Sequence, residues 1–125
     1  MIYALDTNIL SYMLRKDKCV CGRYLEESRR GNECIIPPVA YYEIKRGLLY
    51  ANATSKIQSF DKLCRAFGVG EMNALAWNEA ARLYAFHRQQ GTLIDDADLF
   101  IAAFCLTHGY TCVLEQILNI YCSPP

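Results

Sequence analysis

The chain has 125 residues, with 13 lysines and arginines against 13 aspartates and glutamates, and 53% of its residues are hydrophobic. This length suits a single domain, and the apolar content excludes a disordered chain. The balanced charge excludes a protein that coats nucleic acid through general positive charge. The longest apolar stretch, residues 99–106, is far shorter than the roughly 18–20 residues that span a bilayer. Since the chain opens without a basic segment or a cleavage site, we expect a cytoplasmic protein with no membrane association.

Short apolar strands alternate with helices along the chain. Strands are predicted at residues 2–5, 33–36 and 110–114, where apolar runs are bounded by turn residues. Helices are predicted at residues 7–14, 22–30, 39–50, 55–67, 75–90 and 96–108. Parallel strands joined through helices carry those helices on both faces of the sheet. The sequence therefore predicts an α/β fold, a three-layer α/β/α sandwich around a central parallel sheet.

The seven cysteines are odd in number and scattered along the chain. Only Cys19 and Cys21 lie close together, and their one-residue gap is unlike the paired spacing of a zinc site. We interpret the cysteines as small buried hydrophobic residues in a reducing compartment.

Asp6 is the first candidate functional residue, because it directly follows the first predicted strand. In open parallel sheets, binding sites form beyond the carboxyl ends of the strands. Asp6 followed by Thr7 and Asn8 is also typical of a helix N-cap. The two roles are compatible, so both remain open.

Glu43 and Asp98 are the other two candidates, and both lie on predicted helices. Glu43 falls at the edge of the apolar stripe of its helix, and an exposed pairing with a lysine or arginine is the alternative role. Asp98 is in line with Ile101 and Cys105, which predicts a place at the centre of the apolar face. The helix dipole favours an acid in the first turn, but it does not explain one on that face.

Three carboxylates brought together by the fold would repel one another. Each pair about 4 Å apart costs roughly 4 kcal/mol at an effective dielectric constant near 20. A divalent cation bound between the carboxylates replaces this repulsion with attraction, and ligands that are all oxygen favour Mg²⁺ or Mn²⁺ over Zn²⁺. Such a site suits phosphodiester hydrolysis, because the metal activates a water and stabilises the charge on the phosphate.

Three short motifs occur in order along the chain. They are Asp-Thr-Asn at residues 6–8, Tyr-Glu-Ile-Lys-Arg-Gly-Leu at residues 42–48 and Asp-Leu-Phe-Ile-Ala-Ala at residues 98–103. Together they resemble the PIN-domain ribonucleases, and most of all the VapC toxins of bacterial toxin–antitoxin pairs. The likeness runs from residue 1 to about residue 113. It implies a small α/β/α domain, a homodimer, and Mg²⁺- or Mn²⁺-dependent cleavage of RNA.

The resemblance also assigns roles to particular residues. Asp6, Glu43 and Asp98 correspond to the family's catalytic, metal-binding acids. Thr7 and Asn8 belong to the first motif, and the resemblance implies that they support the ligands through hydrogen bonds. It further implies a cognate antitoxin whose tail occupies the acidic cleft and holds the toxin inactive.

The likeness fails after Val113. The family usually has a threonine followed by asparagine or aspartate there, whereas this chain has Leu114 and Glu115. We therefore treat residues 1–125 as a single PIN-like domain with an atypical tail from about residue 114. Glu115 is a candidate fourth metal ligand or an ordinary exposed acid. A shifted reading frame over residues 115–121 is one hypothesis for the tail, and the gene's nucleotide sequence would decide it.

The altered tail leaves a second function open, a catalytically impaired PIN-like binding protein that keeps its dimer and antitoxin surfaces. A phospho-acceptor signalling domain is disfavoured, because the first strand offers only Asp6 and no lysine follows Lys62. Net charge indicates no RNA specificity. Candidate phosphate contacts, which are equally typical of an ordinary solvated surface, are Arg15, Lys16, Lys18, Arg29 and Arg30.

Overall fold

The computed structural model describes residues 1–113, which fold around a parallel sheet. The three strands of this part of the chain are β1 (Ile2–Leu5), β2 (Glu33–Ile35) and β3 (Thr111–Val113). Their order is β2-β1-β3, so β1 lies in the centre, with Tyr3 opposite Cys34 of β2 and Thr111 of β3. Because all three strands are parallel, their carboxyl ends meet at one edge of the sheet.

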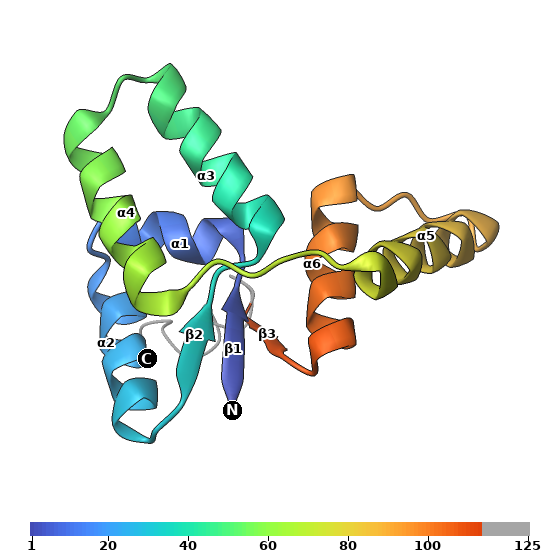
Figure 1. The fold of residues 1–125 in the computed structure, drawn as a ribbon, viewed down its shortest axis with the longest axis horizontal. Helices are drawn as coiled ribbons and strands as arrows, with labels where there is room; N and C mark the ends of the chain where they lie inside the picture. Colours follow the sequence, from blue (N-terminus) through green and yellow to red (C-terminus); the bar gives the residue numbers. More distant parts are fainter. Residues whose placement is uncertain (114–125) are drawn as a thin grey trace, which may run out of the picture.

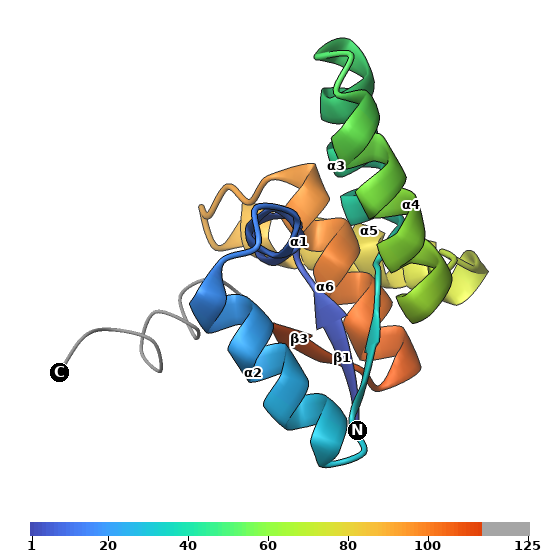
Figure 2. The same ribbon diagram turned by 90° about the vertical axis from the view of Figure 1, so that its left-hand side faces the viewer.

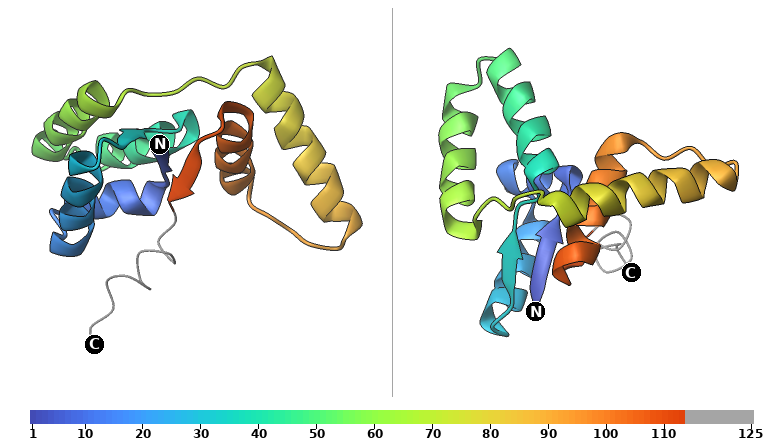
Figure 3. Two further views of the ribbon diagram at one scale, coloured as in Figure 1. Left: turned by 90° about the horizontal axis from the view of Figure 1, so that it is seen from below. Right: turned by 45° about the vertical axis from the view of Figure 1, so that its right-hand side comes forward.

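Six helices surround this sheet within residues 1–113. They are α1 (Thr7–Leu14), α2 (Lys18–Arg29), α3 (Pro38–Tyr50), α4 (Thr54–Phe67), α5 (Ala74–Gln89) and α6 (Asp96–His108). Helices α2 and α6 lie on opposite faces of the sheet (Figure 2). The α3–α4 pair extends beyond the carboxyl edge, and α5 projects to the other side, where it packs on α6 (Figures 1 and 3). The predicted α/β/α architecture with a parallel sheet is therefore confirmed.

The observed helix bounds differ from the prediction mainly at α2. This helix begins at Lys18, one turn before the predicted start, because the Asp17 carboxylate accepts a hydrogen bond from the backbone N–H of Val20 at 3.0 Å. Helices α1 and α6 have their predicted bounds, and α6 ends at Gly109 in the left-handed conformation, at φ 71°. The other predicted ends agree to within one residue.

The hydrophobic core receives side chains from the sheet and from the helices on both faces. Its largest fully buried side chains are Phe60, Phe104, Ile9, Leu10, Ile36 and Pro37. Phe60 of α4 stacks on Tyr41 of α3 with ring centroids 5.7 Å apart, which joins the two helices of the projecting pair. Of the free thiols within residues 1–113, Cys105 is buried and the others are partly buried, so the interpretation of the cysteines as buried hydrophobic residues holds in full for Cys105 alone.

A buried carboxylate, Glu27, ties α2 to the sheet. It accepts hydrogen bonds from the Tyr3 hydroxyl at 3.2 Å and from Asn32 Nδ2 at 2.7 Å. Arg23 and Arg30 lie 3.2 and 3.1 Å from its Oε1. The Asn32 hydrogen bond is the main reason that the pKa of Glu27 is lowered, which keeps this carboxylate charged.

None of the described helices is both long enough and apolar enough to span a bilayer.

Candidate metal centre

Asp6 stands at the carboxyl end of the central strand and is half-buried. Its Oδ1 accepts a hydrogen bond from the backbone N–H of Ile9 at 2.9 Å, which makes it the N-cap of α1. Its own N–H donates to the carbonyl of Val113 at 3.3 Å, and this bond anchors it beside β3. The capping bond orients the carboxylate at the sheet edge where a site is expected.

Glu43 lies on α3, which begins just after β2 and packs against both α1 and α6. Its Oε1 accepts a hydrogen bond from the Thr7 hydroxyl at 2.8 Å, and its Oε2 lies 3.9 Å from Arg46 Nη2. The side chain is 23% exposed. Because Thr7 directly follows Asp6, this hydrogen bond places Glu43 close to the carboxyl end of β1.

Asp98 lies in the first turn of α6 and is exposed, which corrects the prediction that it sits at the centre of the buried face. Ile101 and Cys105, on the same stripe, are buried as predicted. The start of α6 extends past the carboxyl ends of the strands, so the sheet no longer covers the stripe there (Figure 1). Asp98 is therefore on the predicted side of the helix, but at the open edge of the sheet.

The thiol of Cys112, on β3, has a raised pKa. A hydrogen bond with Cys105 of α6 and burial raise the pKa of Cys112, and the negative charges of Asp6 and Asp98 raise it further. Asp6 directly follows β1, and Asp98 lies in the first turn of α6, which starts at the same carboxyl edge of the sheet (Figure 1). The fold thus brings Asp6 and Asp98 to a common region, with Glu43 attached through Thr7.

Within residues 1–113, no three histidine, cysteine, aspartate or glutamate side chains are placed to hold one metal ion together. The donor types nevertheless fit Mg²⁺, because this ion keeps several waters and binds proteins through one or two carboxylates. Asp6 and Asp98 supply two such groups. Zinc fits less well, since its protein sites are built mainly from cysteine and histidine, whereas the candidate ligands here are carboxylates.

The remaining predicted site residues differ in their placement. Thr7 contacts Glu43, whereas Asn8 is exposed in the first turn of α1. Glu115 and the rest of the atypical tail lie outside the described residues, and so does the segment of the reading-frame hypothesis.

A cleft of about 380 Å³ opens between α1, α3 and α4, beside Glu43. Its lining residues are Thr7, Ser11, Leu14, Arg15, Glu43, Ile44, Gly47, Leu48 and Lys56. Of the predicted phosphate contacts, Arg15 lines this cleft, whereas Arg30 pairs with Glu27 near the opposite, amino edge of the sheet. Sequence reasoning missed Lys56, which belongs to no motif and reaches the cleft only through the packing of the helices.

The sequence matches the model of the PIN domain over residues 3–115, so the chain belongs to the PIN domain family, whose members are generally nucleases. No curated protein matches it significantly. Among solved structures, VapBC2 from Rickettsia felis bound to a promoter DNA fragment is similar at TM-score 0.83 and 23% identity, over 97% of this chain and 92% of that one. DNA-bound VapBC from Salmonella typhimurium is similar at TM-score 0.83 and 17% identity, over 99% of this chain and 93% of that one. VapBC-1 from nontypeable Haemophilus influenzae is similar at TM-score 0.79 and 21% identity, over 97% of this chain and 91% of that one.

Proposed function

We propose that this protein is a Mg²⁺- or Mn²⁺-dependent endoribonuclease that acts as the toxin of a toxin–antitoxin pair. The observation that carries the proposal is the placement of the acids at the carboxyl edge of the sheet: Asp6 follows β1, Glu43 is joined to its neighbour Thr7 by a hydrogen bond, and Asp98 lies in the first turn of α6. Membership of the PIN domain family supports nuclease chemistry at this edge. The likeness to chains of VapBC structures supports the fold on which the proposal rests.

In this proposal Asp6 and Asp98 would hold the metal ion, which would supply activation of a water and stabilisation of the charge on the leaving oxygen. The chain's own residues prepare the site. The hydrogen bond from the Ile9 N–H orients Asp6, and the Thr7 hydroxyl holds Glu43 nearby. Glu43 can orient the attacking water through a hydrogen bond, since a carboxylate oxygen accepts several. Its half-buried position limits competing contacts with solvent.

The proposal includes a protein inhibitor that binds at the same acidic edge. An arginine of the inhibitor would take the place of the metal, because its guanidinium forms paired, charge-assisted hydrogen bonds with carboxylates. Inhibition would then weaken as the Mg²⁺ concentration rises. The compared solved structures are described as VapBC complexes, which supports a partner of this kind.

We also propose a homodimer. Helix α5 projects from the body and packs mainly on α6, and it exposes large apolar side chains (Figure 1). Trp77 is 50% exposed, Tyr84 50% and Phe86 56%. Exposed apolar surface of this kind is typical of a protein–protein interface. Sedimentation of the purified protein would test the dimer.

Cleavage of RNA by the purified protein tests the proposed activity. We expect cleavage of a structured RNA with Mn²⁺, no cleavage with EDTA, and none by Asp6→Asn or Asp98→Asn. Cleavage that persists in both variants would overturn the assignment of the two aspartates. A wild-type protein that binds its inhibitor but cleaves no RNA would favour the alternative, an impaired PIN-like binding protein. The residues that follow Val113 motivate that alternative.

A further inference from the structure

The cleft beside Glu43 has acidic and basic ends. Thr7 and Glu43 line the end nearest the carboxyl edge of β1. Arg15 caps the carboxyl end of α1, and Lys56 lies in the first turn of α4, so the two cations line the other end. Between them lie the Ser11 hydroxyl and Gly47. The cleft therefore leads away from the proposed cleavage site toward positive charge.

The two cations are not neutralised within residues 1–113. The Arg15 guanidinium lies over the Tyr12 ring, 4.8 Å from its centroid, and both Arg15 and Lys56 are exposed. Neither forms a salt bridge to an acid in that part of the chain. By contrast, Lys45 on the same α3–α4 pair binds Asp61 at 2.8 Å. Arg15 and Lys56 are therefore available to an anionic ligand.

We propose that this cleft is a subsite for the phosphate backbone of RNA, and that Arg15 and Lys56 hold a phosphate next to the one that is cleaved. This inference rests on the proposed function, because the cleaved bond is taken to lie at the acidic end. An endonuclease must bind nucleotides on both sides of the cleaved bond, and the carboxylates repel each added phosphate. Basic side chains nearby offset that repulsion and supply most of the sequence-independent affinity.

Gly47 provides a way to fill the cleft without disturbing the fold. It lies on α3, and a Cβ built on it meets nothing within 4 Å. A side chain at this position would therefore project into open space. Gly47→Glu adds a negative charge where we place the phosphate, and it also replaces a poor helix former with a good one. Gly22, on α2, is equally open and lies outside the cleft, so Gly22→Glu is a matched control.

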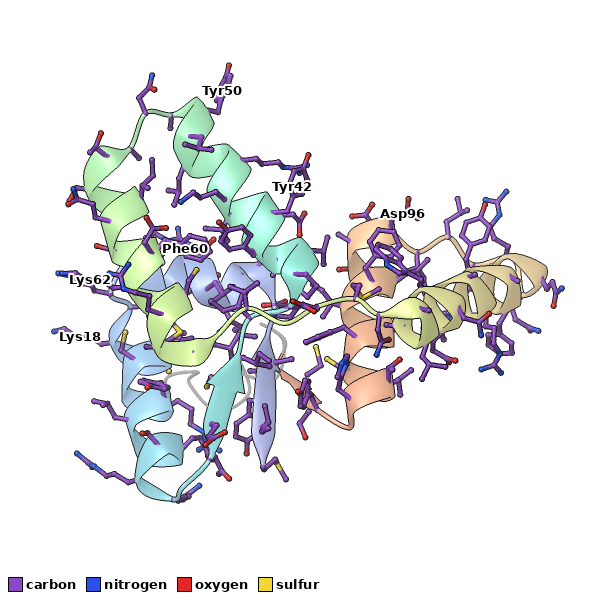
Figure 4. The ribbon with its side chains drawn as sticks, viewed as in Figure 1. Lys18, Tyr42, Tyr50, Phe60, Lys62 and Asp96 are labelled. Atoms are coloured by element: carbon purple, nitrogen blue, oxygen red, sulfur yellow. The ribbon has the colours of Figure 1, made fainter. Side chains whose placement is uncertain are left out.

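The test is the binding of a fluorescein-labelled, single-stranded RNA of random sequence to the full-length protein, in EDTA, at several salt concentrations. Arg15→Ala with Lys56→Ala is compared with Lys62→Ala with Arg65→Ala, which removes one lysine and one arginine from exposed positions of α4 outside the cleft. Lys62 lies on the side of α4 turned away from α3 (Figure 4). We expect the variant with Arg15→Ala and Lys56→Ala to bind RNA more weakly. The slope of log affinity against log salt concentration should fall by about 0.7, the contribution of the one phosphate that the protein no longer neutralises. The control should keep the wild-type slope.

The possible results of this experiment distinguish the proposed RNA subsite from the proposed ribonuclease activity. Equal slopes for the two double variants, or equal weakening by Gly47→Glu and Gly22→Glu, would overturn the subsite even if RNA is cleaved. Cleft-dependent RNA binding without cleavage in Mn²⁺ would support the subsite and overturn the proposed ribonuclease. If the wild-type protein binds no RNA, both proposals fail. Unchanged RNA binding combined with loss of the protein inhibitor would assign the cleft to that partner instead.

Discussion

Substitution of Asp6 separates its structural role from its chemical one. In the structure its Oδ1 caps α1 by accepting the Ile9 N–H at 2.9 Å. Asp6→Ala removes that acceptor, and loss of an N-cap costs roughly 1 kcal/mol. For a domain of this length, such a loss lowers the melting temperature by roughly 3–5 °C. Asparagine caps about as well as aspartate, so Asp6→Asn should melt close to the wild type.

The assay for this prediction is thermal unfolding followed by circular dichroism in EDTA, with RNA cleavage in Mn²⁺ measured on the same samples. Both variants should lose cleavage, because each lacks the charge that holds the metal, but only Asp6→Ala should lose stability. An equal drop in melting temperature for the two variants would refute the capping argument. Retained cleavage in Asp6→Asn would refute the metal-binding role and leave Asp6 as a helix cap alone.

Three further predictions concern other parts of the molecule. Asp98→Asn should abolish Mn²⁺ binding in calorimetry, while the metal-free melting temperature stays level or rises, because the exposed residue loses only repulsion from other negative charges. A melting temperature that falls by many degrees would instead show that Asp98 has a structural role. Gly70→Ala should cost about 1–3 kcal/mol in urea unfolding, because the new Cβ would clash with the ring of buried Phe104. Gly22→Ala, in open space on α2, should not destabilise the protein. Burial raises the pKa of Cys34 to about 11, so alkylation of this thiol by iodoacetamide at pH 9 should be slow in the folded protein. The free energy of unfolding should fall as pH rises from 9.0 toward 11, because the thiol ionises at lower pH in the unfolded chain than in the folded one.

Local interactions explain why most elements were predictable. Asp6 caps α1 through a residue three positions away, and Gly109 ends α6 with a positive φ that glycine adopts without strain. Short apolar runs between such signals indicated the three strands and their parallel arrangement. The one clear boundary error has a local cause as well. The predicted helix began at Gly22, but the hydrogen bond from the Val20 N–H to the Asp17 carboxylate begins α2 one turn earlier.

The candidate acids were identifiable one by one, whereas their surroundings were not. The motifs indicated Asp6, Glu43 and Asp98, but the hydrogen bond from Thr7 to Glu43 joins residues 36 positions apart. No periodicity signals such a contact. The exposure of Asp98 likewise depends on where the sheet ends beneath α6, which is a property of the assembled layers.

The sequence by itself determined the succession of strands and helices, the motifs and the residue types at the site, because these depend on neighbours a few positions away. Only the tertiary structure decided which charges share a surface. It brought Asp6 and Asp98 to the same edge of the sheet, and it placed Lys56 of α4 on the same cleft as Arg15 at the end of α1. The physical reason is that electrostatic interactions depend on distance in space, and packing of the helices on the sheet sets those distances.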